Sequence, residues 1–385
     1  MNRLSVLIIL VLFGCKTSSL TQINIEAKNE ISFDNKTPCL IEIYDANTKY
    51  NLDAKIEARG GISRRYAKKS YEITFKDKIS IGQLTAQKNY ILNSSYIDKT
   101  LMRHKIGFAL FNEMSANNKA SKCLYTTLEY NGEYKGIYVL MEAVNSELLE
   151  LSKNDSLAMI FKDPPVFIQD SIKYVESKNN YYQQKFPKIN NSNKSYYLNE
   201  FKAFLFNTDD LTFAQNIEKW IDLKNITDWH LLLLFSNNGD GVLKNFYLYK
   251  QNSKTPFRIA IWDFDHSFGR DGDNELNNTN PEIAFERSIL LKRLFDNPYL
   301  NYRNKLKLRW EFLRKNEILS SKNFEKHIAI NSKIITNERE KNFDKWPLDG
   351  EYYFDNNSHE KEIEIMIDFV NMNIKKLDHY FKMLK

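Results

Sequence analysis

The chain has 385 residues, which is enough for two regions with substantial cores rather than for one small core. Apolar residues make up 42% of the chain and aromatic residues 14%, and this composition excludes a disordered protein. The net charge of +6, with both signs interspersed, suits an anionic ligand but is too small to indicate nucleic acid. We therefore expect a folded protein that has no nucleic-acid partner.

The first fifteen residues have the pattern of an export signal. A short basic head, residues 1–3, precedes the apolar run Leu4 to Phe13, which is too short to span a bilayer as a helix. The run ends at Gly14-Cys15, which is similar to the lipobox of bacterial lipoproteins. The sequence thus predicts a signal peptide over residues 1–15, lipid on Cys15 and a membrane-anchored protein of the cell envelope, periplasmic or at the outer membrane or surface. The alternative is a plain secretory signal with an incidental cysteine.

The residues that follow the signal predict a β-rich region. Residues 16–37 are polar and are expected to form a tether that leads into a first strand. Alternating apolar and polar residues predict strands at 40–44, 52–58, 69–75, 90–92, 125–130 and 134–141. An Asn-Gly turn between the last two predicts a hairpin. A helix is expected over 101–114, with Asp98 as its candidate N-cap. Residues 38–142 are therefore expected to form an antiparallel sheet with one large helix.

Beyond residue 142 the patterns become helical. Residues 145–195 are rich in Asn, Lys and Tyr and predict a partly irregular insertion. Helices are expected at 198–206, 213–220, 226–236, 286–297, 299–316, 321–338 and 358–383. The run 229–235 is apolar on all sides, which is typical of a central buried helix. The predicted fold class is α+β, with a helical region, 143–385, that contains a catalytic stretch, 237–269, near the junction of the two regions.

Two groups of polar residues in the stretch 237–269 predict a cation site. Asp240 and Asn245 have the spacing D-x-x-x-x-N, and Asp263 and Asp265 come directly after an apolar strand. Carboxylate and amide oxygens are hard ligands that suit a hard divalent cation. Protein kinases use an Asp, an Asn five positions later and a second Asp that opens a D-F-G turn. Each motif alone is also compatible with an acidic turn at a strand end, but together they favour Mg²⁺ or Mn²⁺ and phosphoryl transfer.

Several further motifs resemble the spore-coat protein H (CotH) family of atypical, secreted kinases. The motifs are Arg59-Gly60-Gly61-Ile62-Ser63 with Lys68-Lys69-Ser70-Tyr71, Asp98 to Arg103, Tyr130 to Tyr138 with Glu142, Asp240 to Tyr249, and Ile261 to Asp265 with Phe268-Gly269. The resemblance covers residues 38–270. It implies a two-lobed, atypical protein-kinase-like fold with a β-rich N-lobe and a helical C-lobe. It also implies ATP as a substrate, a divalent cation, and phosphorylation of protein serine or threonine.

The resemblance further implies roles for the acidic residues. Asp240 is expected to be the catalytic or cation-orienting residue, and Asp263 the principal metal ligand. Asn245 is expected to be a second cation ligand, and Asp265 a further one. No His-Arg pair precedes Asp240, and the glycine of the D-F-G turn is replaced by Asp265. Whether Asp240 acts as a base or only holds the metal stays open.

The resemblance also implies phosphate-binding residues. Lys69 is expected to be the phosphate-binding lysine, with its neighbour Lys68 as the alternative, because adjacent residues of a strand face opposite ways. Arg59 and Arg103 are further phosphate candidates. Glu142 is expected to contact the nucleotide or Lys69, or else to be a surface carboxylate.

The function that we expect from these features is an exported lipoprotein kinase that transfers the ATP γ-phosphate to a protein substrate. The alternative is a non-catalytic adhesion module, or a coat or envelope assembly lipoprotein, on the same fold. Transfer to a small molecule or a sugar is a third hypothesis, which the sequence does not separate from a protein acceptor. Residues 270–385 carry no motif that bears on this choice.

Overall fold

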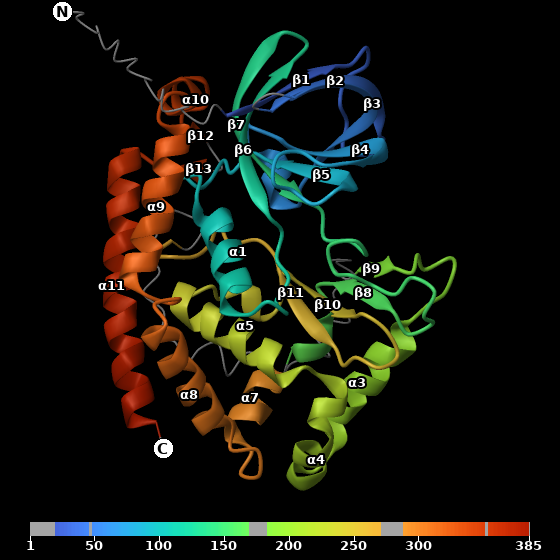
Figure 1. Cartoon of the computed structure of the whole chain (residues 1–385), viewed down its shortest axis with the longest axis vertical. Helices are drawn as coiled ribbons and strands as arrows, with labels where there is room; N and C mark the ends of the chain where they lie inside the picture. Colours follow the sequence, from blue (N-terminus) through green and yellow to red (C-terminus); the bar gives the residue numbers. More distant parts are fainter. Residues whose placement is uncertain (1–19, 46–47, 169–182, 271–287, 351–352, 385) are drawn as a thin grey trace, which may run out of the picture.

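The computed structural model of the chain describes residues 20–45, 48–168, 183–270, 288–350 and 353–384. The predicted signal peptide with Cys15 lies outside these ranges. The structure is mixed α+β, with a β-rich N-terminal region and a helical C-terminal region (Figure 1). Over the described ranges, none of the helices has the length and apolar character that a membrane crossing requires.

The N-terminal strands close into a barrel of order β1-β2-β3-β4-β5-β7-β6. Its strands are β1 (Thr21–Glu26), β2 (Thr37–Asp45), β3 (Thr48–Arg59), β4 (Ser70–Ile79), β5 (Gln87–Asn93), β6 (Cys123–Tyr130) and β7 (Glu133–Glu142). The predicted hairpin is confirmed as β6 and β7. The expected purely antiparallel sheet is corrected, because β1 and β6 pair in parallel and close the barrel.

Apolar side chains fill the inside of the barrel. Ile23 and Ile25 of β1 alternate with polar residues and are 0% and 1% exposed, although they lie in the polar segment that leads into the fold. Ile41, Ile56 and Ile73 from the next three strands are also buried there. The barrel is therefore a packed core, and a ligand has to bind outside it.

A helix and a second sheet lie between the barrel and the helical region. The helix α1 (Arg103–Met114) starts two residues later than predicted, and Met102 rather than Asp98 occupies its N-cap position. The sheet has the order β11-β10-β8-β9 and consists of β8 (Met159–Lys162), β9 (Gln183–Phe186), β10 (Phe246–Lys250) and β11 (Arg258–Ile261). Two of these strands lie in the segment 145–195 that was predicted to be partly irregular.

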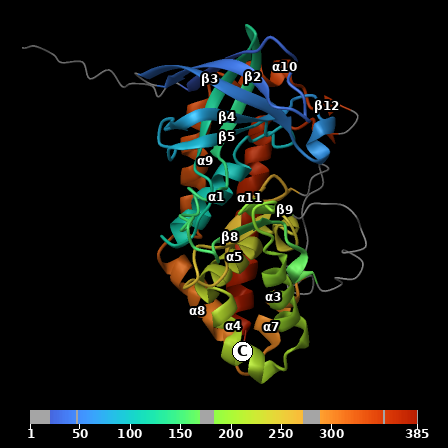
Figure 2. The same cartoon turned by 90° about the vertical axis from the view of Figure 1, so that its right-hand side faces the viewer.

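The remaining helices agree with the predicted ones, apart from shifted ends and one helix that was missed. They are α3 (Ser195–Asn207), α4 (Asp210–Trp220), α5 (Leu223–Ser236), α7 (Ile289–Asp296), α8 (Tyr302–Lys315), α9 (Ser321–Ile335), α10 (Arg339–Lys345) and α11 (His359–Met383). The predicted central helix is α5, which is buried on nearly all sides. Figures 1 and 2 show α9 and α11 running from the lower helices up toward the barrel, where α10 lies.

The missed segment between α9 and α11 joins the helical region to the barrel. We call residues 338–350 and 353–358 the strap; they include α10 and the short strands β12 (Asp349–Gly350) and β13 (Tyr353–Phe354). Its hydrogen bonds to the N-terminal region include those from Trp346 Nε1 to the Lys135 carbonyl (2.9 Å), from Ile137 N to Asn342 Oδ1 (3.0 Å) and from the Tyr353 hydroxyl to the Ile97 carbonyl (2.7 Å). The strap therefore fixes the barrel against the helices.

A buried lysine lies at the centre of this junction. Lys68 is 2% exposed, and its ammonium group donates to the carbonyls of Ser94 and Ile137 and to Asn342 Oδ1. The ammonium also lies 4.5 Å from the centre of the Tyr138 ring. Burial lowers the pKa of Lys68 to about 7, and the three acceptors and the ring offset this by stabilising the ammonium. These contacts place Lys68 in the structural junction.

We expect Lys68→Met to lower the free energy of unfolding by about 2–3 kcal/mol, because it leaves buried acceptors without a donor. Urea denaturation measures this change. The matched control is Lys69→Met, since Lys69 Nζ donates only to the carbonyls of Arg64 and Tyr66 in its own turn. Equal losses in the two variants would contradict the structural role of Lys68.

Candidate active site

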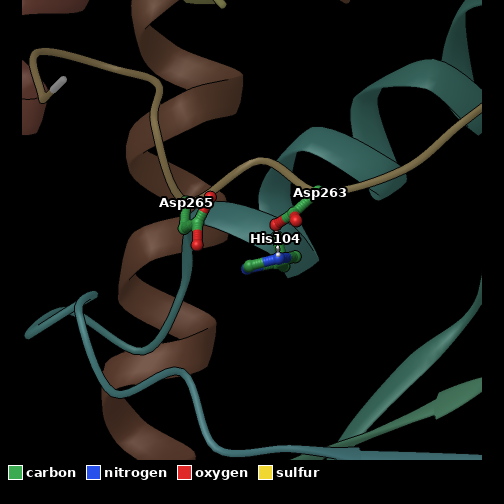
Figure 3. A group of neighbouring side chains, drawn as sticks. All are labelled: His104, Asp263 and Asp265. Carbon is green, nitrogen blue, oxygen red and sulfur yellow. Dashed lines mark hydrogen bonds and ion pairs between the residues drawn. The ribbon is translucent and has the colours of Figure 1, made fainter. Parts of the chain in front are cut away.

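Three side chains from distant parts of the chain converge after β11 (Figure 3). His104 comes from the first turn of α1, while Asp263 and Asp265 come from the loop that follows β11. His104 Nε2 lies 2.8 Å from Asp263 Oδ1. One potential ligand atom from each residue lies within 4.8 Å of the other two. The structure thus brings together Asp263 and Asp265 as predicted, and adds His104, for which the sequence suggested no role.

The backbone at Asp263 adopts an unusual conformation. Its φ is +54°, in the left-handed region that costs an ordinary residue about 1 kcal/mol or more. The neighbouring Trp262 N–H donates to the Asn245 carbonyl (2.9 Å), and Asn238 Nδ2 donates to the Asp263 carbonyl (3.3 Å). These bonds hold the backbone so that the Asp263 carboxylate turns toward His104.

Two helices pack closely on the loop 263–270. On one side, a Cβ atom added to Gly107 of α1 would lie 2.5 Å from the Phe264 ring. On the other side, Gly269 has a φ of +91°, and a Cβ there would lie 2.9 Å from the Phe369 Cβ of α11. Both glycines therefore allow approaches that a larger residue would block.

Buried ion pairs link the same loop to both helices. Arg103 is 1% exposed and donates to Asp98 (2.5 Å), to the Ser267 carbonyl (3.0 Å) and to Glu362 of α11 (3.4 Å). Arg270, at the end of the loop, donates to the same Glu362 carboxylate through Nε (2.9 Å). Arg103 was expected to bind phosphate, but the structure uses its guanidinium for these internal partners.

The charged groups of the cluster shift one another's pKa values. Burial opposes a charge on His104, but its hydrogen bond to Asp263 and the charges of both carboxylates outweigh burial and raise the His104 pKa. Burial and the charge of Asp263 together raise the pKa of Asp265. Asp163 lies nearby, and burial, with the charge of Asp263 as a smaller contribution, raises its pKa as well. The repulsion among these carboxylates is what a bound divalent cation relieves.

Asp240 begins the 3-10 turn η3 (Asp240–Val242), which follows α5. Its carboxylate lies 2.9 Å from Lys244 Nζ, and its side chain is 30% exposed. Asn238 is buried, accepts from the Gly241 N–H (2.9 Å) and donates to the Asp263 carbonyl (3.3 Å). Through Asn238, the turn with Asp240 is joined to the loop with Asp263, so the two predicted motifs are neighbours.

Asn245 lies at the start of β10, where a buried carboxylate fixes its backbone. The N–H groups of Asn245 and Phe246 both donate to Asp163 Oδ1, at 2.7 and 3.3 Å. Lys162 Nζ lies 3.8 Å from the other oxygen of Asp163. No sequence signal pointed to Lys162 and Asp163, because Lys162 ends a four-residue strand and Asp163 follows it, inside a segment that has no clear pattern.

Arg59 is another predicted phosphate-binding residue, and it contacts the site through the residue that precedes Asp263. Its guanidinium lies 5.6 Å from the centre of the Trp262 ring, directly before Asp263 in the chain. Lys69 instead holds its own turn through the carbonyls of Arg64 (2.7 Å) and Tyr66 (2.6 Å).

Two other predicted residues have structural partners. Glu142 is 0% exposed, so the alternative of a surface carboxylate is wrong. Its carboxylate accepts from the N–H groups of Thr85 (2.5 Å) and Lys122 (2.9 Å), so backbone contacts replace the expected contact with Lys69. Lys68 lies in the strap junction described above.

Comparisons with known proteins agree with the predicted family. The family model for the CotH kinase protein matches residues 56–377, which includes the strap as well as both acidic motifs. The inner spore coat protein H of Bacillus subtilis (strain 168) is 26% identical over 248 residues, which is 64% of this chain. The match spans 66% of that relative, just under two thirds of its length. The crystal structure of the Helicobacter pylori proinflammatory kinase CtkA aligns over 91% of this chain and 94% of that chain, with 10% identity and a TM-score of 0.29. A TM-score this low does not establish a common fold.

We expect Glu362→Gln to lower the free energy of unfolding by about 3 kcal/mol, because it removes the buried carboxylate charge that Arg103 and Arg270 share, and Asp98 and Asp355 compensate for it only in part. Urea denaturation at neutral pH measures the loss. Glu364→Gln in the same helix is the matched control, because Glu364 pairs only with Lys361 at the surface and its loss should change stability by less than about 0.5 kcal/mol. A Glu362→Gln protein as stable as this control would refute the importance of the ion pairs.

Proposed function

The chain belongs to the CotH kinase protein family, and from this membership and the site around Asp263 we propose that it transfers the γ-phosphate of ATP to a hydroxyl group of a protein serine or threonine. The single observation that carries this proposal is the convergence of His104, Asp263 and Asp265, of which the first two are 159 positions apart in the chain. Such a convergence of cation-binding groups next to a D-x-x-x-x-N motif is what phosphoryl transfer requires.

The donor groups fit a divalent cation. Two carboxylates lie beside a buried imidazole, and their oxygen and nitrogen atoms are close enough to share one divalent cation. When bound, the cation supplies the charge that neutralises and orients the phosphates of the nucleotide. Asp263 and Asp265 would hold it, and Asn245, whose backbone Asp163 fixes, is the further residue that the motif places there.

The remaining side chains suit the substrates. Arg59, over the Trp262 ring, offers a guanidinium group to phosphate oxygens, and Lys162 offers an ammonium group beside Asp163. Asp240 is partly exposed and would orient the acceptor hydroxyl, while Lys244 keeps its carboxylate paired until the acceptor arrives. We therefore propose Arg59 and Lys162 as the phosphate-binding residues, and not Lys68, Lys69 or Arg103.

We further propose that the β-barrel and the helical region act as the two lobes of a kinase-like fold, with the site between them. The four-stranded sheet and α1 supply the groups that lie at this junction.

We also propose that this protein is exported in the cell and anchored in the envelope through lipid on Cys15. Its acceptor would then be a protein in the same compartment.

We expect Asp263→Asn to reduce phosphate incorporation from radiolabelled ATP by at least about 100-fold, because it removes a charge that holds the cation. Incorporation into the protein itself and into added protein acceptors is measured with Mg²⁺ and with Mn²⁺. Asp53→Asn is the matched control, since Asp53 is exposed on β3 in the barrel. It should retain wild-type incorporation.

The same assay separates the alternatives. ATP turnover without any labelled protein would refute a protein acceptor and favour a small molecule or a sugar. No turnover with either cation in the wild-type protein would refute the kinase proposal and favour a non-catalytic adhesion or assembly lipoprotein. In that case, binding of its partner would survive the loss of Asp263.

A further inference from the structure

His104 supplies a nitrogen atom at a site whose other predicted ligands are oxygens. We propose that His104 is a direct ligand of the cation, and that the resulting His–Asp–Asp site selects Mn²⁺ over Mg²⁺. This inference rests on the proposed cation site, and it adds both a ligand and a metal preference to it. The D-x-x-x-x-N and D-F-x motifs contain no histidine at this place, so the preference comes from residues of this chain.

The distances within the cluster suit a shared ion. Two ligands that lie about 2.1 Å from one octahedral ion, at right angles to each other, are about 3.0 Å apart. His104 Nε2 and Asp263 Oδ1 are 2.8 Å apart, close to this value. The ligand atoms of all three residues lie within 4.8 Å of one another, and opposite octahedral ligands lie about 4.2 Å apart. A small rotation of the Asp265 carboxylate therefore completes three positions around one ion.

The position of His104 is fixed by its surroundings. The side chain is 3% exposed, and its ring meets the Phe108 ring edge-on at 6.0 Å between centres. The preceding residue, Arg103, is held by its buried ion pairs with Asp98 and Glu362. The imidazole cannot move to solvent without unpacking the start of α1, so Nε2 stays directed at Asp263. A ligand that is held in this way loses little entropy when the ion binds.

The chemistry of the donors decides the metal. Mg²⁺ prefers oxygen ligands and keeps several waters, whereas imidazole nitrogen binds first-row transition cations more strongly. Within that series, Mn²⁺ shares with Mg²⁺ the preference for carboxylate and water ligands in octahedral geometry. A mixed site of one imidazole and two carboxylates therefore favours Mn²⁺ over Mg²⁺ more strongly than a site of oxygens alone.

The competing interpretation is that His104 only hydrogen-bonds to Asp263 and positions it. Both interpretations share the 2.8 Å contact, but they differ in one observable. Ligation places an imidazole nitrogen in the first shell of the ion, and positioning does not. Pulsed electron paramagnetic resonance on bound Mn²⁺ detects the coupling to a directly coordinated ¹⁴N nucleus.

The test uses the full-length protein without a histidine tag, loaded with one equivalent of Mn²⁺. We expect ¹⁴N coupling in the wild-type protein, its loss in His104→Asn, and its retention in His266→Asn. The latter is the matched control, because His266 Nε2 lies 3.9 Å from Asp265 Oδ1 and is the competing source of nitrogen. Absence of ¹⁴N coupling in the wild type, or its loss only in His266→Asn, would overturn the proposal. Because the wild type and His266→Asn alone decide the result, a poorly folded His104→Asn protein leaves the test intact.

Metal affinity provides a second measurement. Trp262 directly precedes Asp263, and its fluorescence should report binding of Mn²⁺ and of Mg²⁺. We expect the wild type to bind Mn²⁺ at least about tenfold more tightly than Mg²⁺, and His104→Asn to lose most of that preference. Equal affinities in the wild type would contradict the proposal. Neither measurement requires catalysis, so a Mn²⁺ site with ¹⁴N coupling but no phosphate transfer would refute the kinase proposal alone.

Discussion

The carboxylate of Glu362 is the constraint on which the rest of the structure depends. It lies on α11, more than ninety positions after the loop 263–270, and it neutralises both Arg103 at the start of α1 and Arg270 at the end of that loop. All three groups are buried, so none of them can be satisfied by water. The helix that carries His104 and the loop that carries Asp263 are therefore held at one place by a residue from the C-terminal part of the chain.

This arrangement explains how the site keeps an unfavourable backbone. The left-handed conformation of Asp263 persists because Asn238 holds its carbonyl and because α1 and α11 pack on the loop through Gly107 and Gly269. The strap adds a second connection, in which Lys68 and Asn342 join the barrel to the helices. Both connections fix the position of the donor groups before any ligand binds, which reduces the reorganisation that binding requires.

The sequence predicted the parts of this structure that depend on local patterns. The hairpin, the central helix α5 and the acidic residues Asp263 and Asp265 follow from alternation, apolar periodicity and spacing. The missed features depend on contacts between distant residues. No local sequence pattern predicts the closure of the barrel by β1 and β6, the strap, or the approach of His104 to Asp263. The same limit explains why Arg103 was predicted to bind phosphate, since a motif identifies a residue but does not show which side chains it contacts in the fold.

The most direct test of the central claim, that the cluster of His104, Asp263 and Asp265 is the cation site, is the anomalous diffraction of crystals of the protein soaked in Mn²⁺. If this cluster holds the cation, one strong anomalous peak will lie within about 2.5 Å of the Asp263 carboxylate, in contact with Asp265 and His104. A peak that contacts Asp240 and Asn245 but not Asp263, or no ordered peak at a saturating Mn²⁺ concentration, would contradict it.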